Sequence, residues 1–149
     1  MAFDIDDVNS CLRGELAACE TYRQALEKSR SEYGTDPKFQ QLEKMMRNHE
    51  QAVTLLQSLV RQKGGTPDTD SGAWGTWANT VMGASKLLGD RAALKALKEG
   101  EESGMKQYRG LIDDTDTPAD VRDAAMKLLK NDKEHVTRLD TMMETLATA

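Results

Sequence analysis

Apolar residues recur at three- and four-residue spacing through most of the chain, and glycine and proline interrupt this pattern at only a few places. Such spacing puts the apolar side chains on one face of an α-helix, and that face must be buried against other helices. The interruptions leave four long segments, for which we expect helices at about 6–33, 37–63, 90–113 and 118–147. The pattern therefore predicts an all-α fold.

The residues between these segments are typical of helix ends. Gly34 is a good C-terminal cap, and Asp36-Pro37 has the form of an N-cap followed by a first-turn proline. Gly64-Gly65 ends the second segment. These signals predict a short turn between the first two helices and, by the same reasoning, between the last two.

The connection between the second and third helices is long. It contains a further amphipathic pattern at about 73–88, for which we expect a short crossover helix with Trp74 and Trp77 at least partly buried. Two helical hairpins joined by a long crossover have the connectivity of a ferritin-like four-helix bundle.

Size and charge limit the remaining possibilities. A chain of 149 residues fits one domain, which we place at 1–149. Its net charge of -5, with both signs interspersed, argues against a nucleic-acid or anionic-membrane partner. No apolar stretch approaches the roughly 20 residues that span a bilayer.

Two cysteines bear on the compartment. Cys11 and Cys19 fall on the buried face of one predicted helix, roughly 12 Å apart along its axis, which is too far for a disulfide. The acidic N-terminal sequence lacks the apolar run of a secretory signal. Two reduced thiols without an export signal predict a cytoplasmic protein.

The two halves of the chain match at one constant offset. The matching pairs are Gly14-Glu15 with Gly100-Glu101, Tyr22-Arg23 with Tyr108-Arg109, and His49 with His135. Any two amphipathic helices share leucines, but the chain has only these two histidines, and their match needs another explanation. The pattern predicts that one helical hairpin was duplicated.

Five ionisable residues interrupt the apolar faces: Glu15, His49, Glu101, Asp132 and His135. Antiparallel hairpins would bring them to a common level near the middle of the bundle. Three buried carboxylates need compensation, either from one or two divalent cations, from protonated histidines, or from raised carboxyl pKa values. A mixture of imidazole and carboxylate suits iron, manganese or zinc.

Tyr22 and Tyr108 follow the two glutamates by two helical turns on the same faces. Their hydroxyl groups could support the ligands of a metal, or the tyrosines could be ordinary core residues.

Taken together, these features resemble the rubrerythrin and ferritin-like superfamily. The segments LRGELAACETYRQAL, SGAWGTWANTVMGASKLLGDRAALKALKEGEESGMKQY and KEHVTRLD are similar, more closely, to an uncharacterised bacterial family with a ferritin-like domain of unknown function. The resemblance covers nearly the whole chain. It implies a metal site with one Glu from each of the first and third helices and a Glu-x-x-His pair from each of the other two.

The chain follows this implied pattern only in part. Glu15, Glu101 and the two histidines match, and Asp132 is a shortened form of the expected glutamate. Met46, however, replaces the other glutamate, and Gly104 stands where rubrerythrins carry a further acidic ligand. The implied site is thinned to three carboxylates and two histidines, which fits a mononuclear or vestigial site as well as a di-iron centre.

Two functions are consistent with the sequence. The first is a ferritin-like metal protein that binds iron, manganese or zinc at the five polar residues. The second is a non-enzymatic bundle that binds a protein partner or forms a homo-oligomer, with the old site kept as a buried Glu-His network and no cofactor.

Overall fold

The structure is a computed structural model that describes residues 3–71 and 91–148. It contains helices α1 (Ile5–Tyr33), α2 (Pro37–Gln62), α4 (Arg91–Asp113) and α5 (Ala119–Thr148), and these two stretches include no strand. The predicted all-α four-helix bundle is therefore confirmed. The crossover helix expected at about 73–88, with Trp74 and Trp77, lies outside the described residues.

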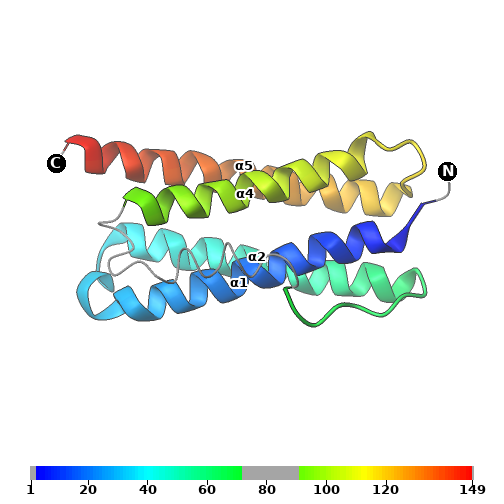
Figure 1. Ribbon diagram of the computed structural model, residues 1–149, viewed down its shortest axis with the longest axis horizontal. Helices are drawn as coiled ribbons and strands as arrows, with labels where there is room; N and C mark the ends of the chain where they lie inside the picture. The colour runs from blue at the N-terminus through cyan, green and yellow to red at the C-terminus, as the bar shows by residue number, and fades with distance from the viewer. Residues whose placement is uncertain (1–2, 72–90, 149) are drawn as a thin grey trace.

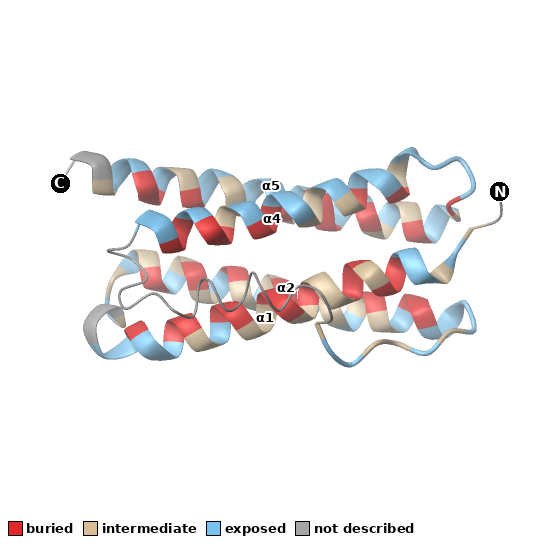
Figure 2. Cartoon of the chain, in the orientation of Figure 1, coloured by how far each residue is buried: buried red, intermediate tan, exposed pale blue. Residues whose placement is uncertain are grey.

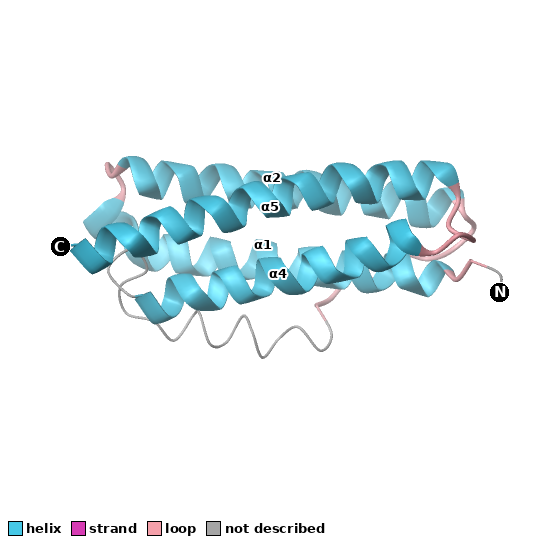
Figure 3. Cartoon of the chain, turned by 90° about the horizontal axis from the view of Figure 1, so that it is seen from above, coloured by secondary structure: helices cyan, strands magenta, loops and turns pink. Residues whose placement is uncertain are grey.

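The helices form two antiparallel hairpins, α1 with α2 and α4 with α5 (Figure 1). The hairpins meet along two lines, where α1 lies beside α4 and α2 beside α5 (Figure 3). Helix α2 ends at one end of the bundle, and α4 begins at the other. This is the topology of a ferritin-like fold.

Local hydrogen bonds begin and end the helices where the sequence predicts. The Asp36 carboxylate accepts a hydrogen bond from the Lys38 backbone N–H at 2.8 Å, with Pro37 in the first turn of α2. After α2, the backbone of Gly64 and Gly65 donates to the Arg61 and Val60 carbonyl groups. This pairing is a Schellman motif, and Gly64 has the positive φ of 83° that the motif requires.

The interior consists of two apolar clusters with a polar layer between them. The largest fully buried residues of one cluster are Tyr22, Leu26, Phe39, Leu42, Met45, Leu94, Leu97 and Leu139. The other is built around Leu12, Leu56, Tyr108, Val121 and Leu128. The polar layer is thus fixed by packed side chains on both sides along the bundle axis.

The buried face of α2 differs from the predicted one. The apolar spacing of the sequence predicts Met46 and Val53 on the buried face with His49. In the structure Met45 and Ala52 are buried instead, and Met46 and Val53 are half-buried. Met45 and Ala52 fit helical spacing around His49 as well as Met46 and Val53 do. Helix α2 is rotated about its axis so that the first pair faces the core. Cys19 is likewise half-buried rather than a core residue, while Cys11 is buried as expected.

Exposed residues cover the outward faces of the helices (Figure 2). Among the described residues, Met126 is the single large apolar side chain that is exposed. No helix in this part of the chain combines the length and apolar character needed to cross a membrane.

Two glycine substitutions should have opposite effects on stability. Gly64→Ala should lower the free energy of unfolding by about 1 kcal/mol, because a Cβ is strained at a positive φ. Gly110→Ala should raise it by a similar amount, because a Cβ at Gly110 meets no atom and alanine favours a helix. Urea unfolding followed by circular dichroism measures both. Equal effects of the two changes would contradict the left-handed backbone conformation of Gly64.

Candidate functional site

All four helices contribute to the polar layer. Glu15 comes from α1, His49 from α2, Glu101 from α4, and Asp132 and His135 from α5. None of these five residues is more than 5% exposed. The structure thus brings all five sequence-selected residues into the interior, at one level between the apolar clusters.

The His49 ring lies between two carboxylates. Its Nδ1 is 2.5 Å from Glu15 Oε2, and its Nε2 is 2.6 Å from Glu101 Oε1. Both contacts are hydrogen bonds to ionised carboxylates when the ring carries a proton on each nitrogen. Burial opposes this charge, but Glu101 and Glu15 outweigh it and raise the pKa of His49 well above its usual value.

Glu101 uses its two oxygens very differently. Oε1 accepts hydrogen bonds from Tyr22 at 2.7 Å and His49 at 2.6 Å, and it lies 3.2 Å from His135 Nδ1. Oε2 is buried and has no hydrogen-bond partner among the described residues. Burial favours the protonated form, but the charge of His49 and the hydrogen bonds from both histidines hold the Glu101 pKa far below its usual value.

The two tyrosines support the glutamates of the opposite hairpin. Tyr22 on α1 donates to Glu101, and Tyr108 on α4 donates to Glu15 Oε1 at 2.5 Å. Burial, together with these carboxylates, raises the pKa of both phenols well above 10.0, so they remain donors. The sequence left open whether the two tyrosines are core residues or support the site. In the structure they do both, because they are buried in the core and their hydroxyl groups position two site carboxylates.

One residue of the site was missed by sequence reasoning. The Asn48 side-chain Nδ2 lies 3.0 Å from His135 Nε2, and in this orientation it donates to the ring. His135 Nδ1 then donates to Glu101, which defines the neutral tautomer. Asn48 lies beside the buried face of α2 and is half-buried. Its position next to His49 was the one signal in the sequence that could have revealed it.

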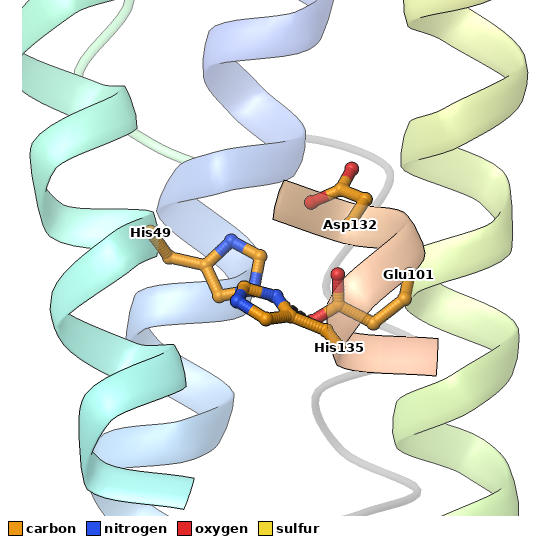
Figure 4. Close-up of side chains that lie close together, drawn as sticks. All are labelled: His49, Glu101, Asp132 and His135. Atoms are coloured by element: carbon orange, nitrogen blue, oxygen red, sulfur yellow. Dashed lines mark hydrogen bonds and ion pairs between the residues drawn. The ribbon is translucent and has the colours of Figure 1, made fainter. Parts of the chain in front are cut away.

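Asp132 lies on the other side of the Glu101 carboxylate from the histidine rings (Figure 4). Burial and the charges of Glu101 and Glu15 raise the pKa of Asp132 well above its usual value. Its Oδ2 would be 2.9 Å from a Cβ at position 104, so Gly104 leaves the space that this carboxyl occupies. The glycine that departs from the rubrerythrin pattern therefore has a direct structural role here.

A small cavity adjoins these carboxyl groups. It has a volume of about 20 Å³ and is lined by Glu15, Glu101, Asp132, Gly104 and neighbouring residues of α1 and α4. This space is sufficient for one water-sized group.

Four side chains are close enough to share one ion. One donor atom from each of His49, Glu101, Asp132 and His135 lies within 4.8 Å of the others. Glu15 is not a member of this group. Its two oxygens contact His49 and Tyr108. The cluster of two imidazoles and two carboxyl groups is compatible with metal binding.

Neither cysteine adds a reactive group to the site. Burial is the main cause that raises the pKa of Cys19, to about 12, and it raises that of Cys11 as well. Both thiols are therefore protonated and unreactive at neutral pH.

Comparisons with known proteins agree with this architecture. A family model described as "Domain of unknown function (DUF2383)" matches residues 35–114, more than half of the chain, including His49 and Glu101. No curated protein has a significantly similar sequence. Among solved structures, the chain is similar to a dodecameric thioferritin, the bacterioferritin-related protein of Bacteroides fragilis. The TM-score is 0.77 at 16% identity, over 97% of this chain and 86% of the other, which establishes the fold alone.

Asp132→Asn should make the metal-free protein more stable at neutral and alkaline pH. Folded Asp132 keeps its proton to higher pH than the unfolded chain, so the parent loses stability as the pH rises above the ordinary value of 3.8. Asparagine does not titrate. We expect an advantage of about 1–3 kcal/mol near pH 8 that disappears near pH 4.

Urea unfolding in the presence of a chelator measures this difference, and Asp123→Asn, at an exposed position of the same helix, is the matched control. A constant difference across the pH range would show that Asp132 is ionised in the folded protein.

Proposed function

The chain belongs to the family described as Domain of unknown function (DUF2383), and we propose that its ferritin-like bundle binds one divalent metal ion. The ligands are His49, Glu101, Asp132 and His135, and the ion is iron, manganese or zinc. The observation that carries this proposal is the Oε2 atom of Glu101, which is buried without a hydrogen-bond partner among the described residues.

Protonation of the histidine and the carboxyl groups compensates the buried negative charges of the polar layer poorly. A doubly protonated His49 satisfies one oxygen of Glu15 and one of Glu101. The second Glu101 oxygen has no hydrogen-bond partner among the described residues, so only a proton kept on Asp132 beside it could supply a donor. A carboxylate oxygen buried without a donor is costly. A divalent cation would compensate both groups, which favours metal binding over a Glu-His network that serves only the structure.

The remaining polar residues fit supporting roles. Glu15 faces Nδ1 of His49 and leaves Nε2 toward the other ligands, which is the carboxylate-histidine arrangement that orients a metal-binding imidazole. Tyr22 and Tyr108 hold the two glutamates in place. Met46 packs against the apolar cluster that contains Phe39, so the position supplies no ligand. These roles support a site for one ion.

The bound ion would determine the chemistry. Iron or manganese would supply one-electron redox chemistry at this site, whereas zinc would supply charge alone. In each case the protein contributes a dry, positioned set of ligands, and His49 must lose one proton when a cation is bound.

We also propose that copies of this chain associate with one another. The structurally similar protein from Bacteroides fragilis is dodecameric. With Met126 as the one large exposed apolar residue of the described part, the contact would be mainly polar. Light scattering coupled to size-exclusion chromatography tests the association, and a monomer at high concentration would contradict it.

Metal binding should stabilise the parent protein and should not stabilise a variant that lacks one ligand. At a metal concentration of about 100 Kd, the parent should gain about 2.7 kcal/mol, because the cation binds the folded state alone. Asp132→Asn should lose most of this gain, although it is the more stable protein without metal. His135→Asn provides a second ligand variant. The measurement is thermal unfolding of chelator-treated protein with Fe²⁺, Mn²⁺ or Zn²⁺ added.

Asp123→Asn should gain as much as the parent. If the parent gains nothing with any of the three ions, the metal proposal is wrong, and the buried Glu-His network is the remaining explanation of the five residues.

A further inference from the structure

A surface groove between α1 and α4 leads toward the buried cavity. It has a volume of about 260 Å³ and is lined by Asp7, Ser10, Cys11, Gln107, Gly110, Leu111 and Asp114. Cys11 and Gln107 also line the buried cavity of about 20 Å³, whose other walls include Glu15, Glu101 and Asp132. The two spaces thus adjoin through shared residues. Their boundary includes a hydrogen bond from Gln107 Nε2 to Ser10 Oγ of 2.7 Å.

The outer end of this groove is acidic. Asp7 in the first turn of α1 and Asp114 just after α4 lie on its two sides. Burial and the charges of Asp4, Asp114 and Asp6 raise the pKa of Asp7, which reflects how closely these carboxylates are crowded. Among the described residues, no lysine or arginine lines the groove or the cavity beneath it.

The opposite side of the bundle has the contrary charge. A hollow between α2 and α5 is lined by Lys130, Lys133 and Arg138, with Glu134 as its single acidic residue. A cation approaching the polar layer is therefore repelled on the α2–α5 side and attracted on the α1–α4 side.

The inner end of the route presents one acceptor without a hydrogen-bond partner among the described residues. Glu101 lines the cavity, and its Oε2 has no hydrogen-bond partner among the described residues. Asp132 lies beside it in Figure 4 and also lines the cavity. Gly104 also lines the cavity, and its lack of a side chain leaves room there for the Asp132 carboxyl.

These observations point to an entry route, and we infer that divalent cations reach the buried ligands through the α1–α4 groove, with Asp7 and Asp114 as the capture site at its mouth. The inference rests on the proposed metal binding. It assigns a function to residues that make no contact with the bound ion. The groove should therefore control the rate of metal uptake and leave the final affinity unchanged.

Two variants test the route in different ways. Asp7→Asn with Asp114→Asn removes the charge at the mouth, and asparagine keeps the acceptor that the Asp116 backbone N–H uses at position 114. Gly110→Leu fills the groove, and a Cβ at this position meets no atom. We expect each variant to slow the second-order uptake of Co²⁺ by about 10-fold at low ionic strength, with the equilibrium affinity unchanged within about twofold.

The experiment mixes metal-free full-length protein with Co²⁺ in a stopped-flow spectrometer and follows the visible absorption of the bound ion. Glu99→Gln with Glu144→Gln removes the same charge from exposed positions of α4 and α5 outside the groove. Thr137→Leu places the same leucine side chain in the α2–α5 hollow. Both controls should take up Co²⁺ at the parent rate.

The outcomes separate the two proposals. If the parent binds no Co²⁺ even after long equilibration, the proposed metal site and the route are both wrong. If the parent binds Co²⁺ but both groove variants take it up at the parent rate, the site stands and the route is wrong. A slow rate in Thr137→Leu would place the entrance on the α2–α5 side and would also overturn the inference.

Discussion

The His49 ring lies between Glu15 and Glu101 with a nitrogen about as close to each carboxylate as a hydrogen bond allows, 2.5 and 2.6 Å. This bridge determines the state of the whole polar layer. With a proton on each nitrogen, the ring neutralises part of the charge of two buried carboxylates, which allows them to remain ionised. The third carboxyl, Asp132, has no such partner, and burial together with the charges of Glu101 and Glu15 raises its pKa. One imidazole therefore leaves the layer with an excess of negative charge.

Hydrogen bonds across the bundle hold this layer in register. Each tyrosine donates to the glutamate of the other hairpin, so neither α1 nor α4 can slide without leaving a buried carboxylate short of a donor. The two halves are alike in this respect, as the predicted duplication requires, although duplication itself stays a prediction. The histidines differ: His49 bridges two carboxylates, whereas His135 lies between Glu101 and the Asn48 amide. The asymmetry leaves one Glu101 oxygen beside Asp132 without a hydrogen-bond partner among the described residues.

The sequence predicted the fold and the members of the polar layer for the same physical reason. An ionisable residue within an apolar helical face has to be buried with it, so Glu15, Glu101 and Asp132 could be identified from spacing alone. The rotation of α2 could not, because Met45 and Met46 satisfy the same period and the neighbouring helices decide between them. Asn48 was missed for this reason too, since its contact with His135 depends on that rotation. The pairing of each tyrosine with a particular carboxylate likewise depends on the distance between the two hairpins. The spacing of residues along the sequence does not determine this distance.

The charges of the layer also bear on how many ions it can hold. With His49 neutral, three carboxylates and one divalent cation leave a net charge of one negative unit, which Tyr22 and Tyr108 can stabilise through their hydroxyl donors. Two divalent cations would leave an excess of positive charge in a dry interior, and compensation would require a further anion. The adjoining cavity of about 20 Å³ holds about one water-sized group. The loss of a carboxylate at Met46 therefore changes the capacity of the site, because the remaining acidic groups match one cation better than two.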